Sequence, residues 1–104
     1  MIASSVHSVC RPRFQAGHLE LTPAVQALIR SGSFDLSHYL CRHLTGDWGD
    51  IDPSDRSANE QALLYGGPLL SSYCIAPDVN LRIVTKAGRL VTTASMQEVA
   101  SVSG

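Results

Sequence analysis

The stretch 42–62 concentrates the side chains best suited to chemistry. It contains His43, the single tryptophan Trp48, two glycines and a cluster of aspartates. An imidazole, whose ordinary pKa is about 6.5, suits general acid–base catalysis at neutral pH. Aspartates gathered in one loop suit a divalent cation. A purely structural role is the alternative to each of these possibilities.

His43 falls in the last turn of an amphipathic helical pattern, on its apolar stripe. A charged histidine there interacts favourably with the helix C-terminus. We therefore expect a half-buried, structural His43 held near the carbonyls of its own helix end. A role as general acid or base is the alternative.

The acidic residues of this stretch are Asp47, Asp50, Asp52 and Asp55. Their spacing differs from that of an EF-hand loop. Asp52 precedes Pro53 and is expected to cap a helix, with Asp55 in its first turn. Only Asp47 and Asp50 are then left as possible metal ligands. The sequence therefore predicts no metal site, and we predict no cofactor.

Trp48 lies between two glycines, which let the backbone pass close to other elements. We expect it to anchor the core, while an exposed Trp48 would indicate a stacking platform or an interface hot spot. The side chains that we predict for binding are Trp48, Asp47, Asp50, Tyr73 and Arg89.

Arg82, Lys86 and Arg89 gather around the last predicted hairpin. They are either the solvated face of a one-sided sheet or a surface that contacts phosphate. The formal net charge is -1, so no global basic field favours nucleic acid. Nucleic acid is thus a possible partner only through these three residues, and a protein partner of unknown identity is expected first.

The periodicity predicts an α+β domain. Helices are expected near 23–31, 35–45 and 53–65, because Thr22-Pro23 and Asp52-Pro53 are start signals and glycines follow the helical patterns. After Pro68 the period changes to two, which predicts strands near 69–76, 81–86 and 89–95. We expect about three N-terminal helices packed on one face of a three-stranded antiparallel β-meander.

The chain has 104 residues, which is one domain, and is 44% hydrophobic and 16% charged, which is typical of a compact core. We expect a poorly ordered lead-in over 1–20, the domain over 21–96 and a loose tail over 97–104. The expected core residues are Leu28, Leu36, Leu40, Trp48, Ala62, Tyr73, Ile83 and Val91 or Leu90.

The three cysteines are Cys10, Cys41 and Cys74. They are odd in number and lack C-x-x-C spacing, so we expect neither a disulfide framework nor a zinc site. This favours a cytoplasmic location. No apolar run suits a membrane helix and no signal peptide is recognised, so no membrane association is expected.

The stretch from about Leu21 to Thr93 resembles a group of small bacterial proteins common on plasmids and other mobile elements. The resemblance is carried by Arg42-His43 and the run from Thr45 to Asp50. Further matching positions are Asp55, Asn59, Gly67, Leu70-Ser71 (or Leu70-Ser72), Tyr73, Ile83, Thr85, Arg89 and Thr92-Thr93. Members are often labelled as related to restriction-modification. The resemblance implies a fold unit and a mobile-element setting rather than a mechanism.

Two functions follow as hypotheses. The first is a small non-enzymatic binding or regulatory protein of a mobile element, acting through protein contacts, with Trp48, Tyr73 or the last hairpin as anchors. The second is a metal-independent ribonuclease of barnase–colicin-like architecture, suggested by the order of helices and strands. Its candidate catalytic residues are His43, Arg82, Arg89 and Thr92. The ribonuclease needs His43 and Arg89 in one cleft, so a His43 packed against Leu40 and Trp48 without a cleft favours the binding protein.

Overall fold

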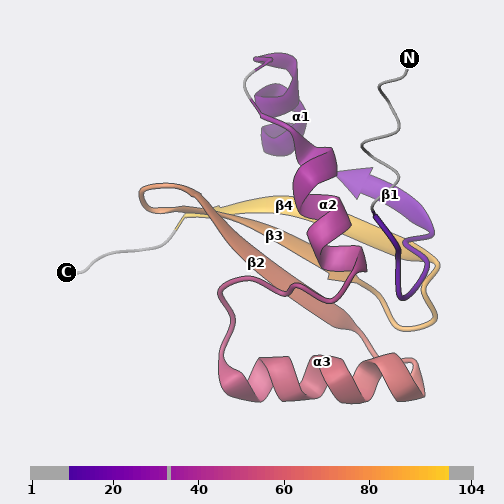
Figure 1. The fold of residues 1–104 in the computed structure, drawn as a ribbon. Helices are drawn as coiled ribbons and strands as arrows, with labels where there is room; N and C mark the ends of the chain where they lie inside the picture. Colours follow the sequence, from indigo (N-terminus) through magenta and orange to yellow (C-terminus); the bar gives the residue numbers. More distant parts are fainter. Residues whose placement is uncertain (1–9, 33, 99–104) are drawn as a thin grey trace.

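The computed structural model describes residues 10–32 and 34–98 and shows an α+β fold of three helices and one four-stranded sheet (Figure 1). In chain order the elements are β1 (His18–Leu21), α1 (Pro23–Arg30), α2 (Leu36–Leu44), α3 (Pro53–Tyr65), β2 (Leu69–Ala76), β3 (Val79–Thr85) and β4 (Val91–Glu98). None of the helices in these described ranges is long and apolar enough to cross a membrane.

The sheet has the strand order β1-β4-β3-β2 and is mixed. β2, β3 and β4 pair antiparallel, as predicted, but β1 pairs parallel with β4 in a register that sets His18 opposite Val91. The prediction of a three-stranded antiparallel meander after N-terminal helices is therefore wrong. A strand of four residues carries too short an alternation to be recognised, and its pairing partner lies at the other end of the chain.

The inner face of the sheet is covered by α1 and α2, whereas α3 packs against the first residues of β2 (Figure 1). Side chains alternate along each strand, so one set points inward. The inward set that is fully buried consists of Leu69, Ser71, Tyr73, Leu81, Ile83, Thr85, Thr92 and Ala94. Three of these residues, Ser71, Thr85 and Thr92, bury an aliphatic hydroxyl group.

Two apolar clusters form the core. The larger contains Val25, Leu36, Tyr73, Leu81, Ile83 and Ala94, and the smaller contains Trp48, Ala62 and Leu69. Among the expected core residues, Leu36, Trp48, Ala62, Tyr73 and Ile83 are confirmed as buried, whereas Leu28, Leu40 and Val91 are only half-buried. Leu90 is exposed, because it lies beside the hairpin turn, before β4 begins.

The helix ends follow the predicted local signals with one exception. Thr22 Oγ1 accepts a hydrogen bond from the Val25 N–H at 3.5 Å, and Asp35 caps α2 by accepting from the Ser37 N–H at 3.1 Å. Asp52 occupies the N-cap position of α3, but its side chain makes no cap hydrogen bond. That part of the prediction is wrong, and Asp55 is the acid of the first turn.

The expectation that the cysteines are free is wrong for two of them. Cys10, in the segment before β1, and Cys41, on α2, form a disulfide with their Cα atoms 5.7 Å apart. Cys74 is free and exposed. Thirty-one positions separate the bonded pair, and no sequence spacing predicts that the N-terminal segment returns to α2.

Candidate functional site

His43 is the centre of a buried polar network. Its side chain is 0% exposed. Nδ1 lies 2.5 Å from the Ser71 hydroxyl and Nε2 lies 2.9 Å from the Thr85 hydroxyl. The expectation of a half-buried histidine near its own helix carbonyls is wrong, because the inner face of the sheet supplies both partners.

The network also fixes the direction of each hydrogen bond. The Thr92 hydroxyl donates to the Ala16 carbonyl at 2.7 Å, since a carbonyl can only accept. The Thr85 hydroxyl, 2.7 Å from that of Thr92, must then donate to it. Thr85 in turn accepts from His43 Nε2–H, and in a neutral imidazole Nδ1 then accepts from Ser71. The geometry thus assigns a proton to Nε2 of His43.

Aromatic rings enclose the imidazole. The centroids of Phe14 and Trp48 lie 5.3 Å and 5.8 Å from that of His43, both in edge-on orientation. Burial, and secondarily the positive charge of Arg89, lowers the pKa of His43 to about 4. A neutral imidazole with both nitrogens bonded and no exposed surface has no free atom for proton transfer to a substrate.

The Trp48–Asp50 loop covers the free edge of β2. The Ser72 N–H donates to the Trp48 carbonyl at 3.1 Å, and the Asp50 N–H donates to the Ser72 carbonyl at 2.7 Å. Gly49 has a φ of +75° and passes so close to the strand that an added Cβ would overlap the Ser72 carbonyl oxygen. The Gly-Asp-Trp-Gly-Asp motif therefore satisfies backbone groups that an edge strand leaves open.

Asn59 extends this edge cover from α3. Its side-chain amide donates to the Leu70 carbonyl at 2.7 Å, and its carbonyl oxygen accepts from the Leu70 N–H at 3.0 Å. Trp48 is also tied to α3, because its indole N–H donates to Glu60 at 3.0 Å. The exposed fraction of Trp48 is 1%, which agrees with a core anchor.

Asp47 holds the loop to α2 and to the sheet. Its carboxylate accepts from Arg42 Nε at 2.7 Å, and its backbone carbonyl accepts from the Tyr73 hydroxyl at 2.6 Å. The hydrogen bond from Arg42 holds the pKa of Asp47 below its usual range. Arg42 also lies over the buried Tyr73 ring, 4.6 Å from its centroid. These contacts occupy two of the predicted binding residues, Asp47 and Tyr73.

Arg89 lies near His43, but its guanidinium is already hydrogen-bonded to other protein groups. Its guanidinium donates to the carbonyls of Gly67 and Ala62 at 2.5 Å and 2.8 Å, which closes the C-terminal end of α3. It also lies 5.5 Å from the Phe14 ring centroid. The structure brings His43, Arg89 and Thr92 to one region, yet that region is filled by protein groups.

Arg82 lies on the opposite face of the sheet from this network. Its neighbours along β3, Ile83 and Leu81, point inward, while Arg82 bonds to Gln97 at 3.2 Å on the outer face. Lys86 is exposed in the hairpin turn. Since Arg89 points toward α3, the three cations do not form one continuous phosphate-contacting surface.

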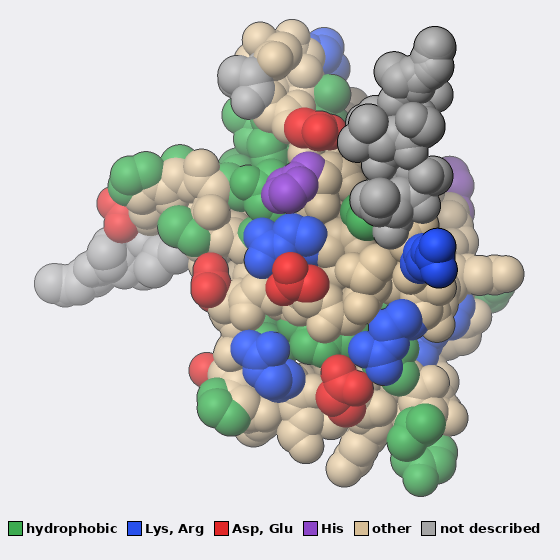
Figure 2. All heavy atoms as spheres, viewed as in Figure 1, with side chains coloured by type: hydrophobic (Ala, Val, Ile, Leu, Met, Phe, Trp, Pro, Cys, Tyr) green, Lys and Arg blue, Asp and Glu red, His purple; other side chains and the backbone are tan. Residues whose placement is uncertain are grey.

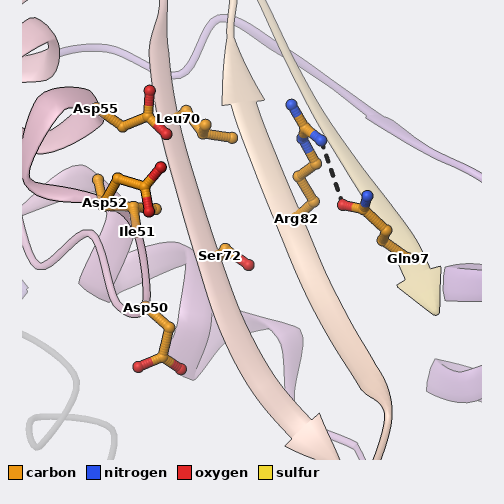
Figure 3. A pocket seen from close by; sticks show the side chains of 8 residues that line it. All are labelled: Asp50, Ile51, Asp52, Asp55, Leu70, Ser72, Arg82 and Gln97. Atoms are coloured by element: carbon orange, nitrogen blue, oxygen red, sulfur yellow. Dashed lines mark hydrogen bonds between the residues drawn. The ribbon is translucent and has the colours of Figure 1, made fainter. Parts of the chain in front are cut away.

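A cavity of about 200 Å³ lies on the outer face, between the start of α3 and β2 (Figure 3). Its lining residues are Asp50, Ile51, Asp52, Asp55, Leu70, Ser72, Arg82 and Gln97. Among the described residues there is no group of three or more histidine, cysteine or acidic side chains arranged to hold a metal ion. The acids that line this cavity do not converge on one point (Figure 3).

Sequence reasoning missed Ser71, Thr85, Asn59 and Phe14 as members of these networks. A usable signal was present for the hydroxyls, because Ser71 and Thr85 occupy inward positions of the alternating strand pattern. Buried hydroxyls need partners, and His43, the buried polar side chain of α2, contacts both of them. No family model, curated protein or solved structure matches this chain.

Proposed function

We propose that this protein is a small non-enzymatic binding protein that acts through protein contacts, in the mobile-element setting that its sequence resemblance implies. The observation that carries this proposal is a group of three large apolar side chains left in solvent. Leu64, Tyr65 and Leu90 are 76%, 83% and 76% exposed. We call these three residues the apolar end.

The apolar end combines two elements that the structure ties together. Leu64 and Tyr65 belong to the last turn of α3, and Leu90 follows the hairpin turn between β3 and β4. The Gly88 N–H donates to the Gly66 carbonyl at 3.3 Å, and Arg89 bonds to Ala62 and Gly67. Figure 2 shows hydrophobic side chains projecting into solvent beside the end of α3. These bonds hold together the two elements that carry the three exposed side chains, and contiguous exposed apolar surface is typical of protein interaction sites.

The chemistry of the apolar end suits a protein partner. Tyrosine is enriched among the residues that dominate interface energies, because it offers a large apolar surface and a polar tip. The anchors first expected, Trp48 and Tyr73, are each 1% exposed. The last hairpin, expected as the third anchor, contributes Leu90. The proposed contact surface is therefore the apolar end.

The ribonuclease hypothesis has less support from the geometry. Its proposed base, His43, has both ring nitrogens bonded and no exposed surface, and its proposed phosphate ligand Arg82 lies on the other face of the sheet. Incubating the purified protein with total RNA in EDTA tests it. RNA cleavage that disappears in a folded His43→Gln variant would restore that hypothesis.

Affinity capture with matched variants tests the proposed binding function. The immobilised wild type, the double variant Leu64→Ser/Tyr65→Ser and a control double variant Ser54→Ala/Ser57→Ala are exposed to a host lysate. The control changes exposed positions at the other end of α3. We expect one or more proteins to be retained by the wild type and the control and lost by the apolar-end variant, with equal melting temperatures for all three. The same retained set for all three would contradict the proposal.

A further inference from the structure

The segment Cys10–Ala16 lies beside the last turns of α2 before the chain enters β1 (Figure 1). It is attached at each end. At its start, Cys10 is bonded to Cys41 of α2, and at its end the Ala16 carbonyl accepts from the Thr92 hydroxyl. Between them, the Arg13 N–H donates to the Leu44 carbonyl at 2.7 Å.

Phe14, in the middle of this segment, covers the His43 network. Its ring packs edge-on against His43 and stacks on Trp48 with centroids 6.3 Å apart. The Arg89 guanidinium lies on the same ring. Phe14 itself is half-buried, while His43 and Trp48 beneath it are almost fully buried. One aromatic side chain on an irregular segment therefore separates this part of the buried network from water.

Apart from the disulfide, few contacts with other described residues hold the segment. The Arg13–Glu60 ion pair is long, at 3.6 Å, and both side chains are about half exposed, so it contributes little. Within the described part of the chain, the segment keeps two hydrogen bonds, to Leu44 and Thr92, and the ring contacts of Phe14. By contrast, β1, which follows, is secured by its ladder with β4.

We propose that the Cys10–Cys41 disulfide is a redox clasp that holds the Cys10–Ala16 segment over His43 and Trp48. Thiol–disulfide exchange with a cellular dithiol opens it. The S–S bond breaks, both sulfurs become thiols by gaining two electrons and two protons, and the dithiol leaves as its own disulfide. The freed segment then withdraws Phe14, which exposes the Trp48 ring, the His43 imidazole and the Arg89 guanidinium together.

This clasp is independent of the proposed binding function, because the apolar end shares none of its residues with the segment. The clasp also accounts for the odd number of cysteines. Two cysteines make the clasp, and the third, Cys74, is exposed on β2 and takes no part. Cys74 therefore provides a matched control.

Trp48 fluorescence tests the clasp directly, because this tryptophan is the only one in the chain. The full chain is oxidised with glutathione disulfide or reduced with dithiothreitol, the disulfide is mapped by peptide mass spectrometry, and quenching by acrylamide is measured. We expect reduction to increase the quenching constant several-fold while the far-ultraviolet circular dichroism stays unchanged. Oxidised Cys74→Ser should behave like the oxidised wild type, and Cys41→Ser like the reduced wild type.

A second variant separates the cover from the bond. Phe14→Ala should show strong quenching even when the disulfide is intact, because the cover itself is missing. Three results would overturn the proposal: Cys10 and Cys41 remaining thiols in the folded, oxidised protein, equal quenching in the oxidised and reduced wild type, or loss of secondary structure on reduction. The comparison of quenching between the oxidised and the reduced wild type tests the proposal even where a cysteine variant fails to fold.

Discussion

The His43 Nε2 and the Thr85 hydroxyl lie 2.9 Å apart, although 42 positions separate them in the chain. This contact joins α2 to the centre of the sheet, and it is one link of a directed series that runs from Ser71 through His43, Thr85 and Thr92 to the Ala16 carbonyl. Every hydroxyl in the series after Ser71 both accepts and donates once. Burial lowers the pKa of His43 to about 4, so at neutral pH the series contains a neutral imidazole.

Acid should therefore destabilise the fold in a defined pH window. The unfolded chain binds a proton at His43 near its ordinary pKa of 6.5, whereas burial lowers the folded pKa to about 4. The contribution of neutral His43 to the free energy of unfolding is complete above the upper pKa. It is lost as the pH falls toward the lower pKa, and the total loss is about 3 kcal/mol. Urea unfolding at a series of pH values measures this loss.

The control for this window is His43→Gln, which keeps a hydrogen-bonding side chain but does not titrate. This variant should be less stable at neutral pH, and its stability should change less between the same two pH values. Asp47 also has a lowered pKa, but its contribution is lost only at lower pH, as its own carboxylate protonates. A variant with the same pH dependence as the wild type would show that His43 is not the group that titrates.

Trp48→Ala should be strongly destabilising. The substitution empties the centre of the smaller core cluster and removes the indole bond to Glu60, at a cost of about 3–5 kcal/mol. Since a domain of this size has roughly 5–10 kcal/mol in total, we expect a much lower melting temperature or a failure to fold. Trp48→Phe, which retains most of the packing, should lose less. Unchanged melting of Trp48→Ala would contradict the buried position.

Gly49→Ala should be far more costly than Gly88→Ala. Both glycines have positive φ, at +75° and +88°, so each alanine is placed in a left-handed conformation that strains its backbone. Only at Gly49 does the new Cβ overlap the Ser72 carbonyl, with the Tyr73 ring 2.6 Å away, whereas nothing lies within 4 Å at Gly88. The difference between the melting temperatures of the two variants measures the cost of the steric overlap at Gly49. Equal losses would mean that the loop does not lie against β2.

Asn59→Leu should destabilise the protein by about 2–4 kcal/mol, because it leaves both the N–H and the carbonyl of Leu70 without their partners. Asn59→Asp keeps an acceptor for the N–H and should lose less. The uncovered β2 edge should also pair with other molecules, so we expect the leucine variant to aggregate at lower protein concentration, as light scattering would show. A monomeric leucine variant of wild-type stability would contradict the edge-covering role.

The local elements could be predicted because their signals are local. The helix starts at Pro23 and Pro53 follow from cap-and-proline pairs, and the strands after Pro68 follow from alternation over seven or eight residues. The burial of Trp48 was also predictable, since a lone large aromatic ring between glycines favours the core. Each of these inferences needs only neighbouring residues.

The amino-acid sequence by itself determined the helices, the antiparallel β2–β3–β4 hairpins and the position of the Gly-Asp-Trp-Gly-Asp loop. Only the tertiary structure decided the parallel docking of β1 on β4, the Cys10–Cys41 bond and the partners of His43. The physical reason is sequence distance. Backbone propensity and side-chain period act within a few residues, whereas these contacts join segments whose proximity depends on how the whole sheet and its covering helices pack.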